Sequence, residues 1–72
     1  MTAPEFSARE KLQEIEREIK FRHRVYSRAV HNGKMKLADA QRKLRLMTAI
    51  AEDYRRLIAA EPDLFNRSSF HG

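Results

Sequence analysis

The fold of this chain is decided at Val30-His31-Asn32-Gly33-Lys34-Met35-Lys36-Leu37, a short stretch between two long segments of helical sequence. Gly33 can adopt the left-handed backbone conformation that ends many helices, and Asn32 before it tolerates the same conformation. The connection over residues 33–36 is so short that the helices on either side have to be antiparallel neighbours. The sequence therefore predicts an all-α fold, an antiparallel two-helix hairpin with its turn at Gly33.

A single apolar stripe runs through the segment before the turn. Its members recur at spacings of three and four, the period of one helix face. They are Ala8, Leu12, Ile15, Ile19, Tyr26 and Ala29, interrupted only by Arg22. Capping-box patterns at Thr2 and at Ser7 compete for the start of this helix. We favour Ser7, because Phe6 would otherwise fall on the helix side opposite the stripe, and expect the first helix over about residues 7–32.

A second stripe with the same spacing follows the turn. Its members are Leu37, Ala40, Leu44, Met47, Ala51, Tyr54 and Ile58. Pro62 ends this stripe, because the residue before a proline is pushed out of the helical region. We expect a second helix over about residues 37–61 and a C-terminal tail over 62–72, all within one domain of residues 1–72.

The position of the turn fixes which residues of the two stripes face each other. With the turn centred near residue 35, facing positions sum to about 69 or 70. Large side chains then face small or medium ones in nearly every layer, as close packing requires. The predicted pairs are Ala29 with Ala40, Tyr26 with Leu44, Arg22 with Met47, Ile19 with Ala51, Ile15 with Tyr54, and Leu12 with Ile58.

The chain is short and lacks cysteine, with 72 residues in all. A single core below roughly 70 to 80 residues seldom supplies more than about 3 to 5 kcal/mol, so small proteins usually add disulfides, a metal or oligomerisation. Without cysteine there are no disulfides, thiolate metal sites or thiol nucleophiles. Oligomerisation is therefore the first device to consider.

Several large apolar residues are left over on the flanks of the two stripes. They lie about 100° around each helix from its stripe, in the same rotational sense, which puts them on one side of an antiparallel hairpin. This side patch, the predicted oligomer interface, consists of Phe21, Val25, Leu46, Ile50 and Leu57. A second copy covering it would complete a four-helix bundle. The alternative is that the tail folds over it, using Leu64, Phe65 and Phe70.

Positive charge is concentrated around the turn. Residues 20–45, the basic tip, hold nine Lys or Arg and one acid, a net charge of +8, while the rest of the chain carries −3. Such a cluster points to phosphates or an acidic protein surface as partner. The residues predicted to make these contacts are Lys20, Arg24, Arg28, Lys34, Lys36, Arg42 and Arg45. The simpler interpretation is that outward-facing charges only keep the helices solvated. Arg22 differs, because it interrupts the stripe and its stem is expected to pack there.

No pattern in the sequence indicates catalysis. His23 and His31 have no carboxylate at metal-ligand spacing, and no serine has a base placed to activate it. We therefore expect no enzyme activity, catalytic residue, metal, cofactor or small-molecule substrate. No apolar run approaches the roughly 18 residues of a membrane span, and the first residues lack a signal-peptide pattern. The chain is expected to be cytoplasmic, with no membrane partner.

Three segments also carry a family resemblance: residues 18–26 (EIKFRHRVY), the turn residues 33–35 (GKM) and residues 44–50 (LRLMTAI). They resemble a family of short uncharacterised helical proteins from bacteriophages and prophages of proteobacteria, over roughly residues 10–60. Members often carry a proline and a tryptophan where this chain has Ser27 and Ala29. The family has no established activity, so the resemblance implies a phage or prophage setting and no mechanism.

These observations favour a non-enzymatic, self-associating interaction module, a small accessory or adaptor protein, with a dimer as the first expectation. The alternative is sequence-independent binding of nucleic acid, or of an acidic protein, through the basic tip. Base stacking is not expected to contribute, because Tyr26 belongs to the stripe and Phe21 to the side patch.

Overall fold

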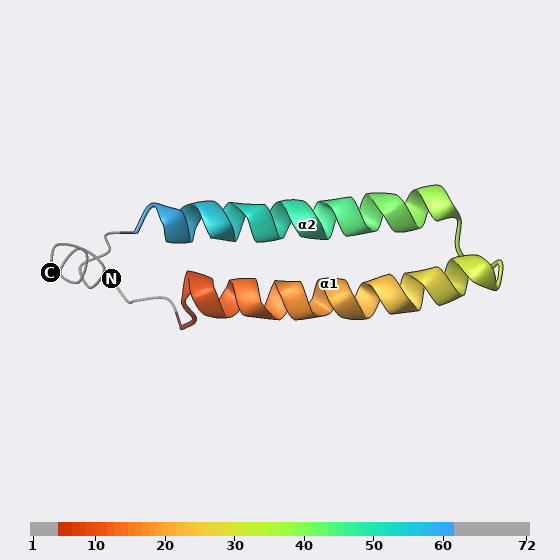
Figure 1. Cartoon of the computed structure of the whole chain (residues 1–72), viewed down its shortest axis with the longest axis horizontal. Coiled ribbons are helices and arrows are strands. Elements are labelled where there is room, and N and C mark those ends of the chain that lie inside the picture. The colour runs from red at the N-terminus through yellow and green to blue at the C-terminus, as the bar shows by residue number, and fades with distance from the viewer. Residues whose placement is uncertain (1–4, 62–72) are drawn as a thin grey trace, which may run out of the picture.

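The computed structural model describes residues 5–61, which form two helices and no strand (Figure 1). Helix α1 spans Ala8–His31 and helix α2 spans Leu37–Ala59. The two helices lie side by side in opposite directions, joined by a short turn at one end of the molecule (Figure 1). The prediction of an all-helical hairpin is confirmed. The predicted tail, with its three large apolar residues, lies outside the described residues.

A capping box fixes the start of α1. The Glu10 backbone N–H donates to the Ser7 hydroxyl at 3.1 Å, and the Ser7 backbone N–H donates to the Glu10 carboxylate at 3.0 Å. Two of the unpaired N–H groups that every helix start presents are satisfied in this way. The helix therefore begins after Ser7, as the sequence predicts.

The turn ends α1 with a Schellman motif. Gly33 has a φ of +72°, in the left-handed region that favours glycine. The Lys34 N–H donates to the Ala29 carbonyl at 2.8 Å, and the Gly33 N–H donates to the Val30 carbonyl at 3.1 Å. These two bonds satisfy carbonyl groups that the last turn of a helix leaves free. The chain leaves α1 in a fixed direction and enters α2 four residues later.

The start of α2 corrects one detail of the predicted stripe. Leu37 was expected to belong to it, but 59% of its surface is exposed. In the predicted register Leu37 would face Asn32 or Gly33, where α1 has already ended, so no helical surface lies opposite it. Val30 and Met35, which no stripe included, are half-buried instead.

Contacts between the helices agree with the predicted register. The Arg55 guanidinium donates to the Glu16 carboxylate at 2.7 Å, and Arg9 lies 3.7 Å from Glu61 near the open end of the hairpin. Ile15 and Tyr54 line one shallow depression, and Leu12 and Ile58 line another. Facing residues therefore sum to about 69 to 71, with no shift by a helical turn.

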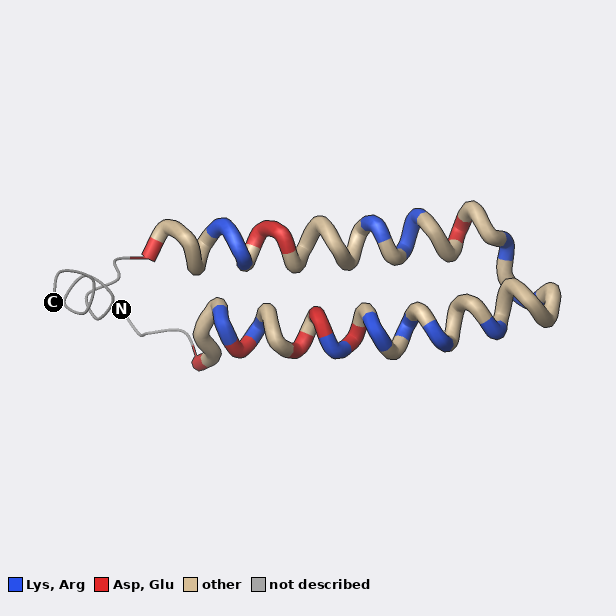
Figure 2. Tube along the Cα trace, in the orientation of Figure 1, with Lys and Arg blue, Asp and Glu red and all other residues tan. Residues whose placement is uncertain are grey.

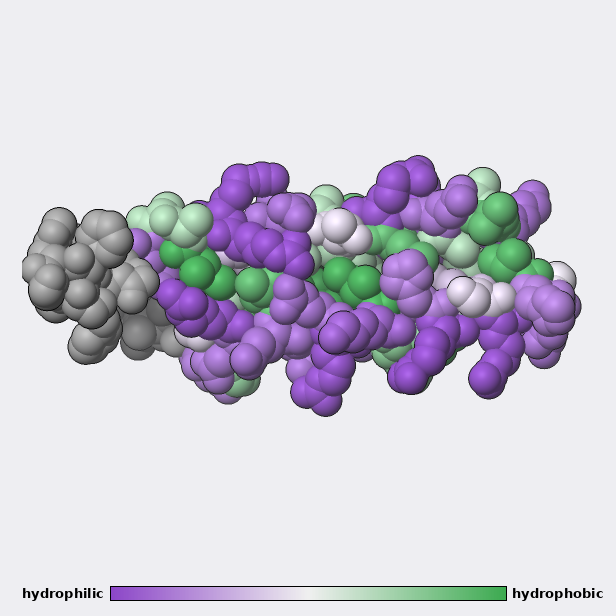
Figure 3. Space-filling view, viewed as in Figure 1, coloured by the Kyte–Doolittle hydropathy of each residue, from purple (hydrophilic) through white to green (hydrophobic). Residues whose placement is uncertain are grey.

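The apolar seam between the helices is shallow. Among the described residues, only Ala40 and Ala51 are buried, at 4% and 0% exposure. The larger stripe residues, such as Leu12, Tyr26 and Ile58, are half-buried. On the face drawn in Figure 3, apolar side chains form a broken band between two hydrophilic margins. One hairpin therefore encloses very little core of its own.

The turn supplies the first testable prediction. Gly33→Ala should lower the free energy of unfolding by about 1 to 2 kcal/mol, because a residue with a Cβ pays that cost in the left-handed region. The added Cβ meets no atom within 4 Å, so the loss would come from the backbone conformation alone. Urea unfolding at one fixed protein concentration measures it. Gly33→Asn is the matched control and should lose less, since asparagine tolerates this conformation.

Candidate functional site

The side patch is exposed in the hairpin. The exposed fractions of its five members are Phe21 47%, Val25 39%, Leu46 56%, Ile50 39% and Leu57 57%. Each side chain keeps between about two fifths and three fifths of its surface exposed, so the other helix of the hairpin covers none of them fully. Two further large apolar residues are exposed elsewhere, Phe6 at 51% and Leu37 at 59%. The sequence pattern singled out neither of these two as a surface residue.

The α1 and α2 parts of the side patch lie on the same side of the hairpin. Ile50 lines a shallow depression together with Glu14 and Glu18 of α1. The same two glutamates line the neighbouring depression with Phe21. Because Glu14 and Glu18 border both, Phe21 of one helix and Ile50 of the other face the same side. The structure thus brings together apolar residues that are about 30 positions apart in the sequence.

Charge is unevenly distributed along the hairpin, as Figure 2 shows. Basic segments dominate the end near the turn, whereas acidic segments gather towards the open end (Figure 2). Within the described residues, the net charge is +8 for 20–45 and −3 for the remainder. The hairpin is therefore polarised along its length.

Ion pairs gather at the open half. Arg55 pairs with both Glu16 and Glu52 at 2.7 Å, and weaker or more exposed pairs link Arg9 with Glu61, Arg17 with Glu14, and Arg56 with Asp53. Arg55 joins the two helices through Glu16. Lys11 adds a second contact across the seam, with its ammonium 5.9 Å from the centre of the Tyr54 ring.

The basic tip lacks such partners. Arg22 pairs with Glu18 at 2.6 Å. In residues 5–61, the other basic side chains of the tip form no ion pair: Lys20, Arg24, Arg28, Lys34, Lys36, Arg42, Lys43 and Arg45. Lys36 is the N-cap residue of α2, and its side chain makes no capping hydrogen bond. In α1, by contrast, the side chain of the N-cap residue Ser7 does make one. The tip therefore concentrates positive charge that the described part of the chain does not neutralise.

Arg22 and Arg55 are held by carboxylates. A hydrogen bond with Glu18, together with its negative charge, raises the pKa of the Arg22 guanidinium. A hydrogen bond with Glu16 likewise raises the pKa of Arg55. Arginine already titrates far above neutrality, so both groups stay charged at any ordinary pH.

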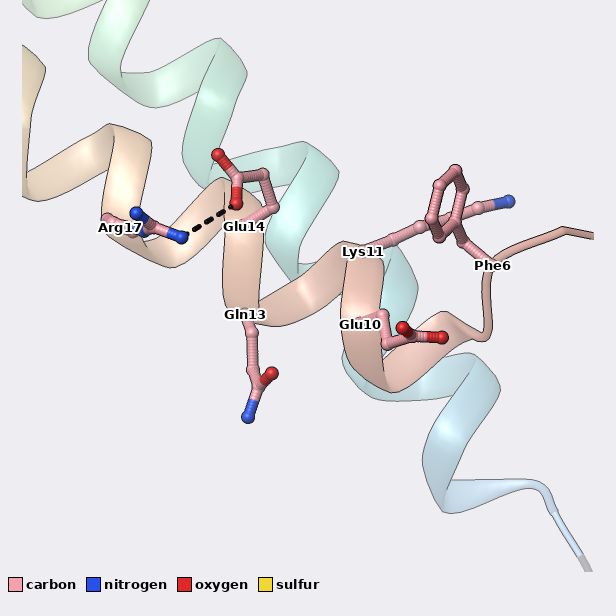
Figure 4. A pocket seen from close by; sticks show the side chains of 6 residues that line it. All are labelled: Phe6, Glu10, Lys11, Gln13, Glu14 and Arg17. Atoms are coloured by element: carbon pink, nitrogen blue, oxygen red, sulfur yellow. Dashed lines mark hydrogen bonds and ion pairs between the residues drawn. The ribbon is translucent and has the colours of Figure 1, made fainter.

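The start of α1 carries a further open depression, shown in Figure 4. It is lined by Phe6, Glu10, Lys11, Gln13, Glu14 and Arg17. The Glu14 carboxylate is engaged by Arg17 at 3.2 Å, and the Gln13 side chain points away from the other labelled groups (Figure 4).

Residues 5–61 contain neither a group of metal-ligating side chains nor a helix that could span a membrane. No group of three or more His, Asp or Glu side chains in residues 5–61 is placed to hold a metal ion. Neither of the two helices is long and apolar enough to cross a membrane. The candidate functional surfaces are therefore the side patch and the basic tip.

Comparison of the chain with protein-family models, with curated proteins and with solved structures finds no match.

Arg22 provides a second prediction, because it occupies a seam position between Ile19 and Tyr26. Arg22→Leu should raise the thermal unfolding midpoint by a few degrees, since leucine extends the apolar seam while the exposed pair with Glu18 contributes little. Arg17→Leu is the matched control: it also breaks an ion pair within α1, but it lies off the seam with 79% of its side chain exposed. Calorimetry measures both midpoints, and a fall for Arg22→Leu would contradict the prediction.

Proposed function

We propose that this protein is a non-enzymatic interaction module that self-associates through the side patch, with two hairpins forming a four-helix bundle. A small accessory or adaptor protein is the role that such a module serves, and the resemblance noted in the sequence suggests a phage or prophage setting. The observation that carries the proposal is the exposed side patch on a hairpin whose only buried residues, within 5–61, are two alanines.

The energetics support association. Fully burying one Val, Leu, Ile or Phe side chain contributes about 1.5 to 3 kcal/mol. The five patch residues keep roughly half of their surface exposed, so covering them would contribute about 4 to 7 kcal/mol for each copy. Both copies gain this in a symmetric dimer, and the sum is comparable to the roughly 4 to 15 kcal/mol that association costs. Further burial of the half-buried seam adds to the gain.

A second copy is a better occupant than a small molecule. The patch follows both helices over several turns, from Leu57 near the open end to Val25 near the turn. The depressions that Phe21 and Ile50 line are open to solvent and do not surround a ligand. Helical bundles bury apolar flanks of this length against other helices. An isologous contact lets one patch cover the same patch on a second copy, so no other protein is required.

The third prediction tests self-association. Ile50→Asp should raise the dimer dissociation constant at least a hundredfold, because each interface would then bury a carboxylate in apolar surroundings. Thr48→Asp is the matched control: it adds the same charge two residues away, on the opposite flank of α2, and should leave the mass unchanged. Light scattering coupled to size exclusion measures the mass. A wild-type mass of one chain at micromolar concentration would contradict the proposal.

Sequence-independent nucleic-acid binding through the basic tip is the second candidate function. It is favoured by the eight basic side chains that form no ion pair within the described residues. Contacts with phosphate groups supply most of the affinity in non-specific binding of nucleic acid. They require only Lys and Arg side chains on an accessible surface. An acidic protein surface would satisfy the same cations.

The fourth prediction concerns this second candidate. Affinity for a DNA duplex should fall with salt at a slope of about 0.9 per phosphate neutralised. Changing Arg24, Arg42 and Arg45 to Glu together should abolish binding in a mobility-shift assay. The matched control changes Arg9, Arg17 and Arg56 to Glu, an equal change of charge at the open half, and should retain binding. No shift of DNA or RNA by the wild type at low salt would remove this function.

A further inference from the structure

Two charged residues extend the side patch along α1. Glu14 stands seven residues before Phe21, and Arg28 stands seven residues after it. Seven residues are close to two full helical turns, so all three occupy the same side of the helix. Glu14 also lines the depression that contains Ile50, which places it on the patch side of the hairpin. The α1 part of the patch therefore has an acid towards the open end and a base towards the turn, at equal distances of roughly 10 Å.

The same arrangement recurs on α2. Lys43 stands seven residues from Ile50, towards the turn, and Asp53 stands seven residues from Leu46, towards the open end. Lys43 and Asp53 are each five positions from residue 48, which is also the midpoint between Leu46 and Ile50. The α2 part of the patch is thus centred at the level of residue 48, as the α1 part is centred at Phe21. It again has a base towards the turn and an acid towards the open end.

The two centres lie at the same level of the hairpin. Phe21 and residue 48 are facing positions in the register that the interhelical contacts support. Consider a two-fold axis that lies in the plane of the patch and runs across both helices at this level. Rotation by 180° about this axis exchanges the acidic and the basic positions on each helix. If a second copy is related to the first by this rotation, each acidic residue at the edge of one patch faces a basic residue at the edge of the other.

From this we infer that two copies pack patch against patch with their turns at opposite ends, around a two-fold axis in the plane of the interface. The axis passes α1 at the level of Phe21, and it passes the patch side of α2 at the level of residue 48, between Leu46 and Ile50. The inference rests on the proposed self-association and specifies its geometry. In this dimer α1 lies along α1 of the partner subunit, and Arg28 faces Glu14 of the partner subunit. On the other helix, Lys43 faces Asp53 of the partner subunit. The apolar centre is closed by Phe21 of both copies.

The opposite orientation, with both turns at the same end, brings charges of the same sign into contact. There α1 lies along α2 of the partner subunit at the same level, which sets Arg28 beside Lys43 of the partner subunit and Glu14 beside Asp53 of the partner subunit. Like charges facing each other suppress a mode of association. It would also bring together two basic tips, each with a net charge of +8.

All four groups are available for these contacts. Arg28 and Lys43 form no ion pair within the described residues. The side chains of Glu14 and Asp53 are 68% and 73% exposed, and their present partners, Arg17 and Arg56, lie within the same helices. Each carboxylate has lone pairs left for a second cation.

Cysteine cross-linking tests the orientation, and the absence of native cysteine makes each introduced thiol unique. Copies carrying Glu14→Cys are mixed with tagged copies carrying Arg28→Cys and treated with a short bismaleimide. The inferred dimer gives a linked pair of tagged and untagged chains. The control mixture of Glu14→Cys with Asp53→Cys gives none, because these positions are then separated by more than roughly 15 Å along the helices. The opposite orientation reverses the two results.

Charge reversal supplies an independent readout in the full chain. Arg28→Glu should raise the dimer dissociation constant roughly tenfold, since two like-charged contacts replace two favourable ones. Adding Glu14→Arg to the same chain should restore it to within about threefold, because each pair is then re-formed with its signs exchanged. Arg45→Glu removes the same charge from the opposite flank of the tip and should have little effect.

The outcomes separate the orientation from self-association. A dimer that links through Glu14→Cys and Arg28→Cys supports the inference. A dimer that links only in the control mixture, or in neither mixture, overturns the orientation while self-association stands. A wild-type chain that remains monomeric overturns both. Failure of Glu14→Arg to rescue Arg28→Glu counts against the inferred pair.

Discussion

Two helices in contact can cover only one stripe of each other, and both the thin core of this hairpin and the exposure of its side patch follow from that constraint. An α-helix is about 10 Å across with side chains, so a single neighbour shields roughly one third of its circumference. Within residues 5–61 that shielding buries only Ala40 and Ala51 and leaves the longer seam residues half-buried. An apolar residue about 100° away from the seam is not covered by the other helix of residues 5–61, as the exposure of the side patch shows. Its burial requires a surface beyond these two helices, and for that reason the side patch is the main candidate site.

The fold was predictable because its signals are local or periodic. The capping box at Ser7 and the left-handed Gly33 are decided by neighbours within a few residues, and the stripes follow from the helical period. The prediction was wrong at Leu37, whose exposure depends on where the opposite helix ends. Periodicity assigns a residue to a helix face, but it does not say whether another element lies opposite that face. Ends of packed elements are therefore the first places where such a prediction is wrong.

The exposure of the side patch was predictable for the same reason. Exposure of the side patch follows from the angle between its residues and the seam, which the sequence alone determines. The ion pairs were not predictable, because Glu16 and Arg55 meet from positions 39 residues apart and need both the register and suitable rotamers. Within residues 5–61, the contrast between the ion pairs of the open half and the eight tip cations that form none depends on side-chain positions, which the sequence does not give. The sequence shows the excess of basic residues near the turn, but it does not show which of them form ion pairs.

The basic residues of the tip do not form a single site, because they face different sides of the hairpin. Arg28 and Lys43 share the side of the patch, at seven-residue spacing from its members. Arg45 lies five residues from Ile50, about 140° around the helix, so a second copy seated on the patch leaves it exposed. A dimer would therefore use one group of cations to set its orientation and present the other to solvent. With the turns at opposite ends, the second group would appear at both ends of one bundle, separated by roughly the length of a helix. An acidic ligand would then meet two equivalent positive ends, so self-association and binding through the tip are compatible in one assembly.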